Sequence, residues 1–323
     1  MELLPWQHTA WQLIARFWQQ KRWPHALLLT GPAGSGKREF AQLLAKVLLC
    51  EQPLTDFRSC GKCASCKLWQ AGNHPDWLLI DGSSEIKIET IRDLLAWGNV
   101  TGQQSGRRVV LIANASSMNN AASNALLKFL EEPSLGTMML LTAERSEQLT
   151  LTIASRCQKL GLTLPTPEAL RAWLAPQVKE ERQLELLINI SEGRPYLALR
   201  YLDDKLFHAR SSFVKALLNS DETKINEALS SEDLPIELLW QIWISVVNDL
   251  IKTELKLDHA IINLDFMEDL QQVSQKNIAR QLVKFLDRLL EQVKALARRI
   301  NLNAGLQGGA LTVRWCQLLN RRI

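Results

Sequence analysis

A glycine-rich segment is the first part of this sequence whose residue types could perform chemistry. Residues 31–38 read GPAGSGKR, follow an apolar run at residues 26–29, and precede a helical pattern that starts near Glu39. This is the spacing of a phosphate-binding P-loop, in which backbone N–H groups and the helix N-terminus hold phosphate and a lysine reaches the β- and γ-phosphates. The expected phosphate-binding residues are Gly31, Gly34, Gly36 and Lys37.

The magnesium side of this loop lacks both groups on which metal-assisted phosphoryl transfer depends. The residue after Lys37 should be Ser or Thr, whose hydroxyl binds Mg²⁺, but it is Arg38, and a guanidinium carries donors only. An acid is expected where the strand pattern at 109–114 ends, but the residues there are Asn114 and Ala115. We therefore expect a degenerate P-loop that does not hydrolyse ATP. The sequence leaves open whether ATP or ADP still binds, and the alternative is an active ATPase with unusual ligands.

Four clustered cysteines could bind a metal ion. They have the spacing C-x9-C-x2-C-x2-C, and they are Cys50, Cys60, Cys63 and Cys66. Four thiolates complete a tetrahedral zinc site without an open position, so we expect a structural Zn²⁺ that pins an insert at residues 50–66. His74 and Asp76 lie close by but are not needed as ligands. Free thiols or disulfides are the alternative, and a reducing compartment disfavours disulfides.

The bulk composition is that of an ordinary globular protein. Hydrophobic residues make up 46% and charged residues 22% of 323 residues, a length sufficient for two or three domains. No apolar run approaches the roughly 20 residues that span a bilayer, and no signal-peptide pattern is apparent, so we expect no membrane contact and a cytoplasmic location. The net charge of +4 permits contact with nucleic acid but does not by itself indicate it.

Strand and helix patterns alternate in the first 164 residues, which predicts a doubly wound α/β sheet. The predicted strands cover 26–29, 77–81, 109–114 and 137–143, and the predicted helices cover 6–20, 39–49, 88–97 and 119–130. After Pro165 every pattern is helical. Three short helices are predicted at 167–174, 182–190 and 196–202, and further helices at 213–218, 236–255, 270–273, 278–296 and 310–319. We expect an α/β domain at 1–164, a small helical domain at 165–206 and a larger helical domain at 207–323.

Further motifs in the first 165 residues carry a resemblance to a known family. Residues 25–29 read HALLL, residues 124–133 read NALLKFLEEP, and residues 155–157 read SRC. Together with the P-loop and the cysteine insert, they resemble the clamp-loader branch of the AAA+ proteins, and best the delta prime family of bacterial DNA polymerase III. The resemblance implies that residues 165–206 are a lid and residues 207–323 an oligomerisation collar.

The motor subunits of the same branch, gamma and tau, differ from this sequence at three positions. Their family has Lys-Thr in the P-loop, Asp-Glu after the strand and Gly-Ser-x-Arg in the lid. The corresponding segments here are Lys37-Arg38, Asn114-Ala115 and Gly193-Arg194-Pro195-Tyr196. All three differences favour the non-motor family over a catalytically active gamma/tau-type ATPase.

The resemblance assigns a role to Arg156, in the Ser-Arg-Cys triplet. It implies an arginine finger that stabilises the γ-phosphate in a neighbouring subunit's ATP site. By itself, an arginine in an exposed turn before a strand is an ordinary solvated residue. Lys128, Glu131 and Glu132 lie near the end of a predicted helix, where they form either a surface pair or part of an inter-subunit or DNA-facing side.

The implied function is that of a non-motor, stator subunit of a sliding-clamp loader in DNA replication. Its partners are the gamma/tau and delta subunits and, through them, the clamp and primed DNA. No ATPase activity is expected of the chain alone, although the polymerase III holoenzyme is a nucleotidyltransferase complex. A free-standing zinc-dependent DNA-binding module is the remaining alternative, and the small charge excess weighs against it.

Overall fold

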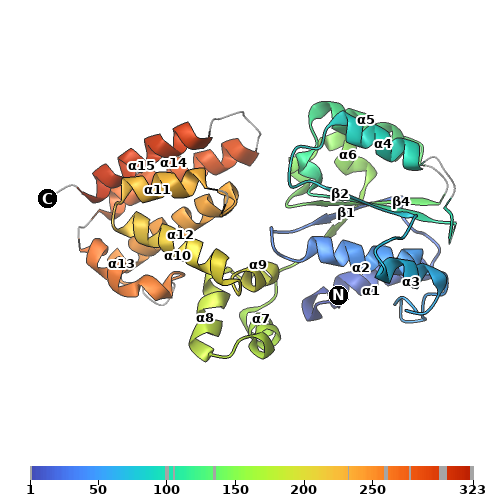
Figure 1. Cartoon of the computed structure of the whole chain (residues 1–323), viewed down its shortest axis with the longest axis horizontal. Helices are drawn as coiled ribbons and strands as arrows, with labels where there is room; N and C mark the ends of the chain where they lie inside the picture. Colours follow the sequence, from blue (N-terminus) through green and yellow to red (C-terminus); the bar gives the residue numbers. More distant parts are fainter. Residues whose placement is uncertain are drawn as a thin grey trace. The chain divides into compact units, whose positions relative to one another are not determined.

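The computed structural model describes residues 2–98, 102–104, 106–133, 136–231, 233–257, 261–275, 278–297 and 304–320. The chain forms two compact units, Met1–Pro165 and Thr166–Ile323 (Figure 1). The first unit alternates strands and helices, and the described part of the second unit is helical.

A five-stranded parallel sheet forms the centre of the first unit, with the strand order β2-β3-β4-β1-β5. The strands are β1 (Ala26–Thr30), β2 (Trp77–Asp81), β3 (Arg108–Ala113), β4 (Thr137–Ala143) and β5 (Gln158–Gly161). The first four agree with the predicted strands to within one residue at each end, which confirms the α/β class. The list of predicted strands omits β5, although a strand is expected after Arg156, because Leu160 is the only large apolar side chain in this four-residue strand and the sequence shows no apolar run there.

Helices cover both faces of the sheet, as is usual for parallel strands. One face carries α1 (His8–Gln19), α2 (Lys37–Leu49) and α3 (Ala64–Gln70), and the other carries α4 (Ile88–Gly98), α5 (Asn120–Glu131) and α6 (Leu151–Arg156) (Figure 1). Successive residues of β1 enter different cores, since Leu28 packs with α4, α5 and α6 whereas Leu27 and Leu29 pack with α1 and α2. The sheet therefore separates two hydrophobic cores.

The second unit consists of helices in the part of the chain that the structure describes. They are α7 (Pro167–Leu174), α8 (Glu181–Ile190), α9 (Pro195–Arg200), α10 (Asp204–Leu218), α11 (Glu222–Ser230), α12 (Ile236–Glu254), α13 (Met267–Ser274), α14 (Ala279–Ala297) and α15 (Ala304–Leu319). Short 3-10 helices lie at Pro5–Gln7, Ala115–Ser117, Ser146–Gln148, Ala175–Gln177 and Leu264–Phe266. Helices α8 to α15 share one core. The division into 165–206 and 207–323 stays a prediction, and α10 spans its boundary.

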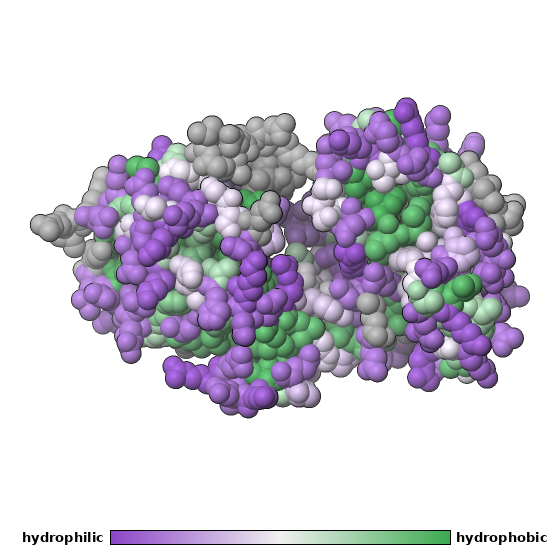
Figure 2. Space-filling model, in the orientation of Figure 1, coloured by the Kyte–Doolittle hydropathy of each residue, from purple (hydrophilic) through white to green (hydrophobic). Residues whose placement is uncertain are grey.

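The face of the molecule that Figure 2 shows is mostly polar. Figure 2 shows hydrophilic residues over most of the face in view, with hydrophobic residues in smaller groups between them. Among the described residues, no helix combines the length and the apolar composition that a membrane span requires. Large apolar side chains gather mainly in the three cores inside the two units.

A buried polar network links α10 and α12 of the second unit to the segment before α13. Arg210 of α10 is 1% exposed and donates hydrogen bonds to Asn263 and Asp265. The amide of Asn263 donates in turn to Ser245 and to the buried carboxylate of Asp249. Because buried charges are tolerated only when they are paired, Arg210 holds this segment against α10, while Asp249 holds it against α12.

Replacing Arg210 with alanine leaves Asp265 without its cation and should destabilise the second unit by about 3–5 kcal/mol. Hydrogen–deuterium exchange of α10 and α12 measures the loss as reduced amide protection. The control is Lys215→Ala, because Lys215 lies on the same helix but is exposed. Equal protection in the two variants would contradict the structural role of Arg210.

Candidate functional site

The P-loop connects β1 to α2 and wraps the N-terminus of that helix. Gly36 is the N-cap residue of α2 and has a left-handed backbone with φ 90°, a conformation that glycine adopts without strain. Gly31 lies against the backbone near the end of β5, where an added Cβ would come within 2.6 Å of the Leu162 carbonyl oxygen. The backbone therefore requires glycine at both positions, in agreement with the strand–loop–helix context predicted from the sequence.

Lys37 folds over the loop that precedes it. Its ammonium donates hydrogen bonds to the carbonyl oxygens of Gly31 at 2.6 Å and Pro32 at 2.8 Å. Burial lowers the pKa of Lys37 to about 8, and the nearby carboxylates of Glu144 and Glu39 oppose that shift. The charge thus lies where a P-loop lysine is expected, but its hydrogen bonds go to the loop itself. Phosphate binding by Gly31, Gly34, Gly36 and Lys37 stays a prediction.

The position expected to hold the Mg²⁺ ligand carries an ion pair. Arg38 donates from Nη1 to Oδ2 of Asp81 at 2.9 Å. Asp81 ends β2 and lies in register with Ala113, which ends the neighbouring strand β3. The side-chain amide of Asn114 donates to the carbonyl oxygen of Gly82 at 2.9 Å, so it serves the loop after β2. A guanidinium therefore neutralises the carboxylate at this edge of the sheet.

The sequence alone does not identify Asp81 as part of this site. Asp81 is an acidic residue at the end of a predicted strand, but the sequence does not show which strand lies beside β3. Only the pairing of β2 with β3 brings Asp81 next to the end of β3. The acid thus comes from the neighbouring strand rather than from β3, and Arg38 already occupies it.

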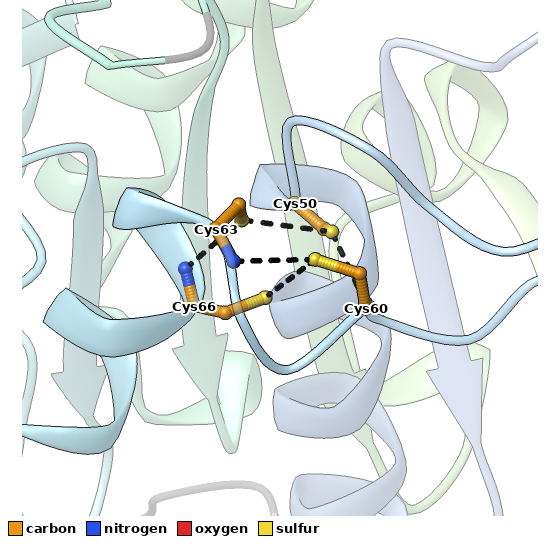
Figure 3. A group of neighbouring side chains, drawn as sticks. All are labelled: Cys50, Cys60, Cys63 and Cys66. Atoms are coloured by element: carbon orange, nitrogen blue, oxygen red, sulfur yellow. Dashed lines mark hydrogen bonds between the residues drawn. The ribbon is translucent and has the colours of Figure 1, made fainter.

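The four cysteines converge on one point (Figure 3). Their Sγ atoms all lie within 4.8 Å of one another. The Sγ atoms of Cys50 and Cys63 are 3.9 Å apart, and those of Cys60 and Cys66 are 4.0 Å apart. A tetrahedron with Zn–S bonds of about 2.3 Å has edges of about 3.8 Å, whereas a disulfide needs about 2.05 Å. The donor set fits a tetrahedral metal, and all four thiols are free of disulfides.

Backbone N–H groups point at three of the sulfur atoms (Figure 3). The N–H groups of Cys60, Cys63 and Cys66 lie 3.3–3.4 Å from the sulfur atoms of Cys50, Cys60 and Cys63 respectively. Hydrogen bonds from the N–H groups of Lys62 and Cys63 lower the pKa of Cys60 to about 6, while burial raises the pKa of Cys50 and Cys66. The thiolate form that binds metal is therefore supported at Cys60, and a bound cation would offset the cost of burial at the other two.

The cysteine segment is fastened to the sheet by a second set of contacts. Ser65 donates to the carbonyl oxygen of Leu49 at 2.6 Å and accepts from Nε2 of His74, also at 2.6 Å. His74 can donate from Nε2 because its Nδ1 accepts the backbone N–H of Asp76 at 3.1 Å. His74 and Asp76 thus support the segment and do not belong to the metal-binding group.

The metal-binding group lies far from the phosphate loop. Cys50 directly follows α2, and residues 39–49 of that helix separate it from the last P-loop residue, Arg38. At 1.5 Å a residue, this is about 16 Å. A metal ion held by the cysteines would therefore be too far away to contact phosphate in the loop. The arrangement suits a structural ion and not a catalytic one.

Arg156 is the last residue of α6, so the prediction of an exposed turn at this position is wrong. The helix is short and contains Thr152 and Ile153, whose β-branched side chains weaken the helical signal in the sequence. The guanidinium is partly exposed and donates to the carbonyl oxygen of Thr152 at 3.1 Å and to the carboxylate of Glu131 at 2.8 Å. The backbone thus directs Arg156 to the surface through a helix end.

Arg156 and the P-loop lie at opposite ends of the sheet. Because β1 and β5 are parallel, Gln158 at the start of β5 pairs with Leu27 near the start of β1. Arg156 precedes Gln158, at the amino ends of the strands, whereas Gly31 follows β1 at their carboxyl ends. Residues 27–31 alone span about 13 Å along the strand. The structure therefore places Arg156 away from the P-loop of its own chain.

Comparison with known proteins places this geometry in a family. A family model described as DNA polymerase III, delta subunit, matches residues 6–166. The DNA polymerase III subunit delta' of Pseudomonas aeruginosa is 34% identical over 326 residues, which cover 98% of each chain. This chain belongs to the delta prime family of DNA polymerase III subunits. The delta' subunit of Escherichia coli K12 is 32% identical over 248 residues, or 74% of each chain.

A solved structure has a fold similar to that of this chain. A gamma subunit-related protein of DNA polymerase III from Thermotoga maritima has a TM-score of 0.51 over 96% of this chain and 99% of its own, at 21% identity. At this identity the likeness concerns the fold alone. The family match over residues 6–166 includes the P-loop, the four cysteines and Arg156.

Metal analysis of the purified chain should find about one zinc ion per chain. Cys63→Ser removes one of four thiolates and should lower the zinc content well below that of the wild-type chain. Cys316→Ser is the matched control, because Cys316 is buried in the second unit and its thiol contacts the Ser220 carbonyl oxygen. A well-folded wild-type chain without zinc would contradict the assignment.

The isolated chain should not hydrolyse ATP in the presence of Mg²⁺, because Arg38 and Asp81 neutralise each other where the metal is needed. Arg38→Thr restores a hydroxyl and frees the carboxylate of Asp81 on β2, but Asn114 and Ala115 still follow β3 where the acid is expected, so phosphate release should stay at background in this variant as well. Robust Mg²⁺-dependent turnover by the wild-type chain would refute this reading of the loop.

Proposed function

We propose that the chain is a non-motor subunit of a bacterial sliding-clamp loader, and that it lends Arg156 to the ATP site of a neighbouring gamma/tau subunit. Its other direct partner is the delta subunit, and through the assembly it helps to load the clamp on primed DNA in the cytoplasm. Membership in the delta prime family supports this assignment. The observation that carries the finger role is the separation of Arg156 from the P-loop of its own chain.

A subunit that does not hydrolyse ATP itself can still supply a positive charge to the ATP site of its neighbour. Phosphoryl transfer spreads negative charge over the γ-phosphate, and a guanidinium from a neighbouring chain stabilises that charge. Arg156 is an arginine at the surface, on the end of a helix and away from its own loop. Its contribution therefore depends on a neighbour and not on the nucleotide state of this chain.

The remaining features have structural roles in the proposal. A zinc ion held by the four cysteines fixes residues 50–66 against α2 and α3. Residues 165–206 act as a helical lid, and residues 207–323 join a collar with the other subunits. Nucleotide binding at the degenerate P-loop is not needed for any of these roles.

The rival function, an active gamma/tau-type ATPase, requires a metal at the P-loop. The Arg38–Asp81 ion pair opposes it, because a second cation there would have to break the pair or face the charge of Arg38. No feature of the described residues favours this rival over the non-motor role.

Arg156→Ala should slow ATP hydrolysis by the loader assembled with gamma/tau and delta subunits. Arginine fingers supplied by a partner accelerate hydrolysis by about 10³-fold or more at the site that receives them. Assembly, followed by size-exclusion chromatography, should be unchanged. Lys159→Ala removes the same charge from an exposed position of β5 and serves as the control. Unchanged turnover in the Arg156→Ala loader would count against the finger role.

A further inference from the structure

Glu131, the carboxylate partner of Arg156, lies on an anchored backbone, as Arg156 does. Glu131 is the last residue of α5, and Arg156 is the last residue of α6. Both helices lie on the same face of the sheet (Figure 1), and both pack into one core, in which Leu130 is 2% exposed and Ile153 is fully buried. The two charged side chains therefore leave neighbouring anchored backbones, although 25 residues separate them along the chain.

The contacts of Arg156 set the orientation of its guanidinium. Nη2 donates to Oε1 of Glu131 at 2.8 Å, and Nη1 donates to the carbonyl oxygen of Thr152 at 3.1 Å. Two contacts on different nitrogen atoms fix the plane of a rigid, planar group. An arginine has five N–H donors, so these two contacts leave donors on the same plane for an incoming anion.

We propose that Glu131 is a positioning residue for Arg156, which it holds in the orientation that the neighbouring ATP site receives. This inference rests on the proposed finger role of Arg156. A free arginine side chain samples many rotamers, and restricting them beforehand removes part of the entropy cost at the transition state. Glu131 acts through Arg156 and does not itself meet the phosphate.

The expected effect is small because the pair lies at the surface. The side chains of Arg156 and Glu131 are 36% and 50% exposed, and exposed ion pairs are worth at most about 1 kcal/mol, which corresponds to a factor of up to about five. A pair of this strength contributes little to folding. An effect on hydrolysis at the neighbouring site would therefore reflect the orientation of Arg156 and not the stability of the domain.

Single-turnover ATP hydrolysis by the assembled loader tests the proposal, with four versions of this chain: wild type, Glu131→Gln, Arg156→Ala and the double variant. The part of the time course that slows in Arg156→Ala defines the Arg156-dependent phase. We expect Glu131→Gln to slow this phase up to about fivefold at saturating ATP, with an unchanged Kd for ATP. In the Arg156→Ala background, Glu131→Gln should have no further effect, because its action passes through Arg156.

Glu132→Gln is the matched control, since it removes the same charge from the adjacent exposed position. It should leave the Arg156-dependent phase unchanged. A wild-type or faster rate in Glu131→Gln, with Arg156→Ala slow, would overturn the positioning role alone. An effect of Glu131→Gln that persists in the double variant would also overturn it, because it would reveal a general structural role. No effect of Arg156→Ala would instead overturn the proposed function.

Discussion

The parallel direction of the five strands is the constraint on which the rest of the first unit depends. The carboxyl ends of all five strands lie at the same end of the sheet, so the loops after β1, β2 and β3 gather there. Each connecting helix must carry the chain back to the end of the sheet at which the strands begin. This single geometric fact brings Arg38 to Asp81 at one end of the sheet and Arg156 to Glu131 at the other.

The two arginines show how position decides the consequence of one residue type. Arg38 lies at the edge where a P-loop protein needs a cation, and it supplies that cation permanently, bound to a carboxylate on β2. A permanent guanidinium cannot accept lone pairs from phosphate and water as Mg²⁺ does. Arg156 has a carboxylate partner too, and the side chains of both pairs are partly exposed. The two arginines therefore differ in the end of the sheet at which they lie and not in their burial.

Local signals in the sequence predicted much of this architecture. The apolar runs of β1 to β4 are each long enough to be visible in the sequence, and the P-loop and the cysteines are recognisable from spacing alone. The short elements α3, β5, α6 and α11 were not predicted, because few of their residues are buried and packing, rather than propensity, holds them. The Arg38–Asp81 and Arg156–Glu131 pairs could not be predicted from the sequence for a different reason. Each joins residues far apart in the sequence, and only the order of the strands and the packing of the helices brings them together.

The position of the cysteine cluster also follows from the direction of the strands and helices. It follows α2, so it lies near the end of the sheet opposite the P-loop, and its distance from that loop excludes a direct part in phosphate chemistry. Its contacts run instead through Ser65 and His74 to the start of β2. A metal at this point would hold together the segment between α2 and β2, which includes α3. Asp81 ends β2, so the same strand begins next to the cysteine segment and ends at the carboxylate that binds Arg38.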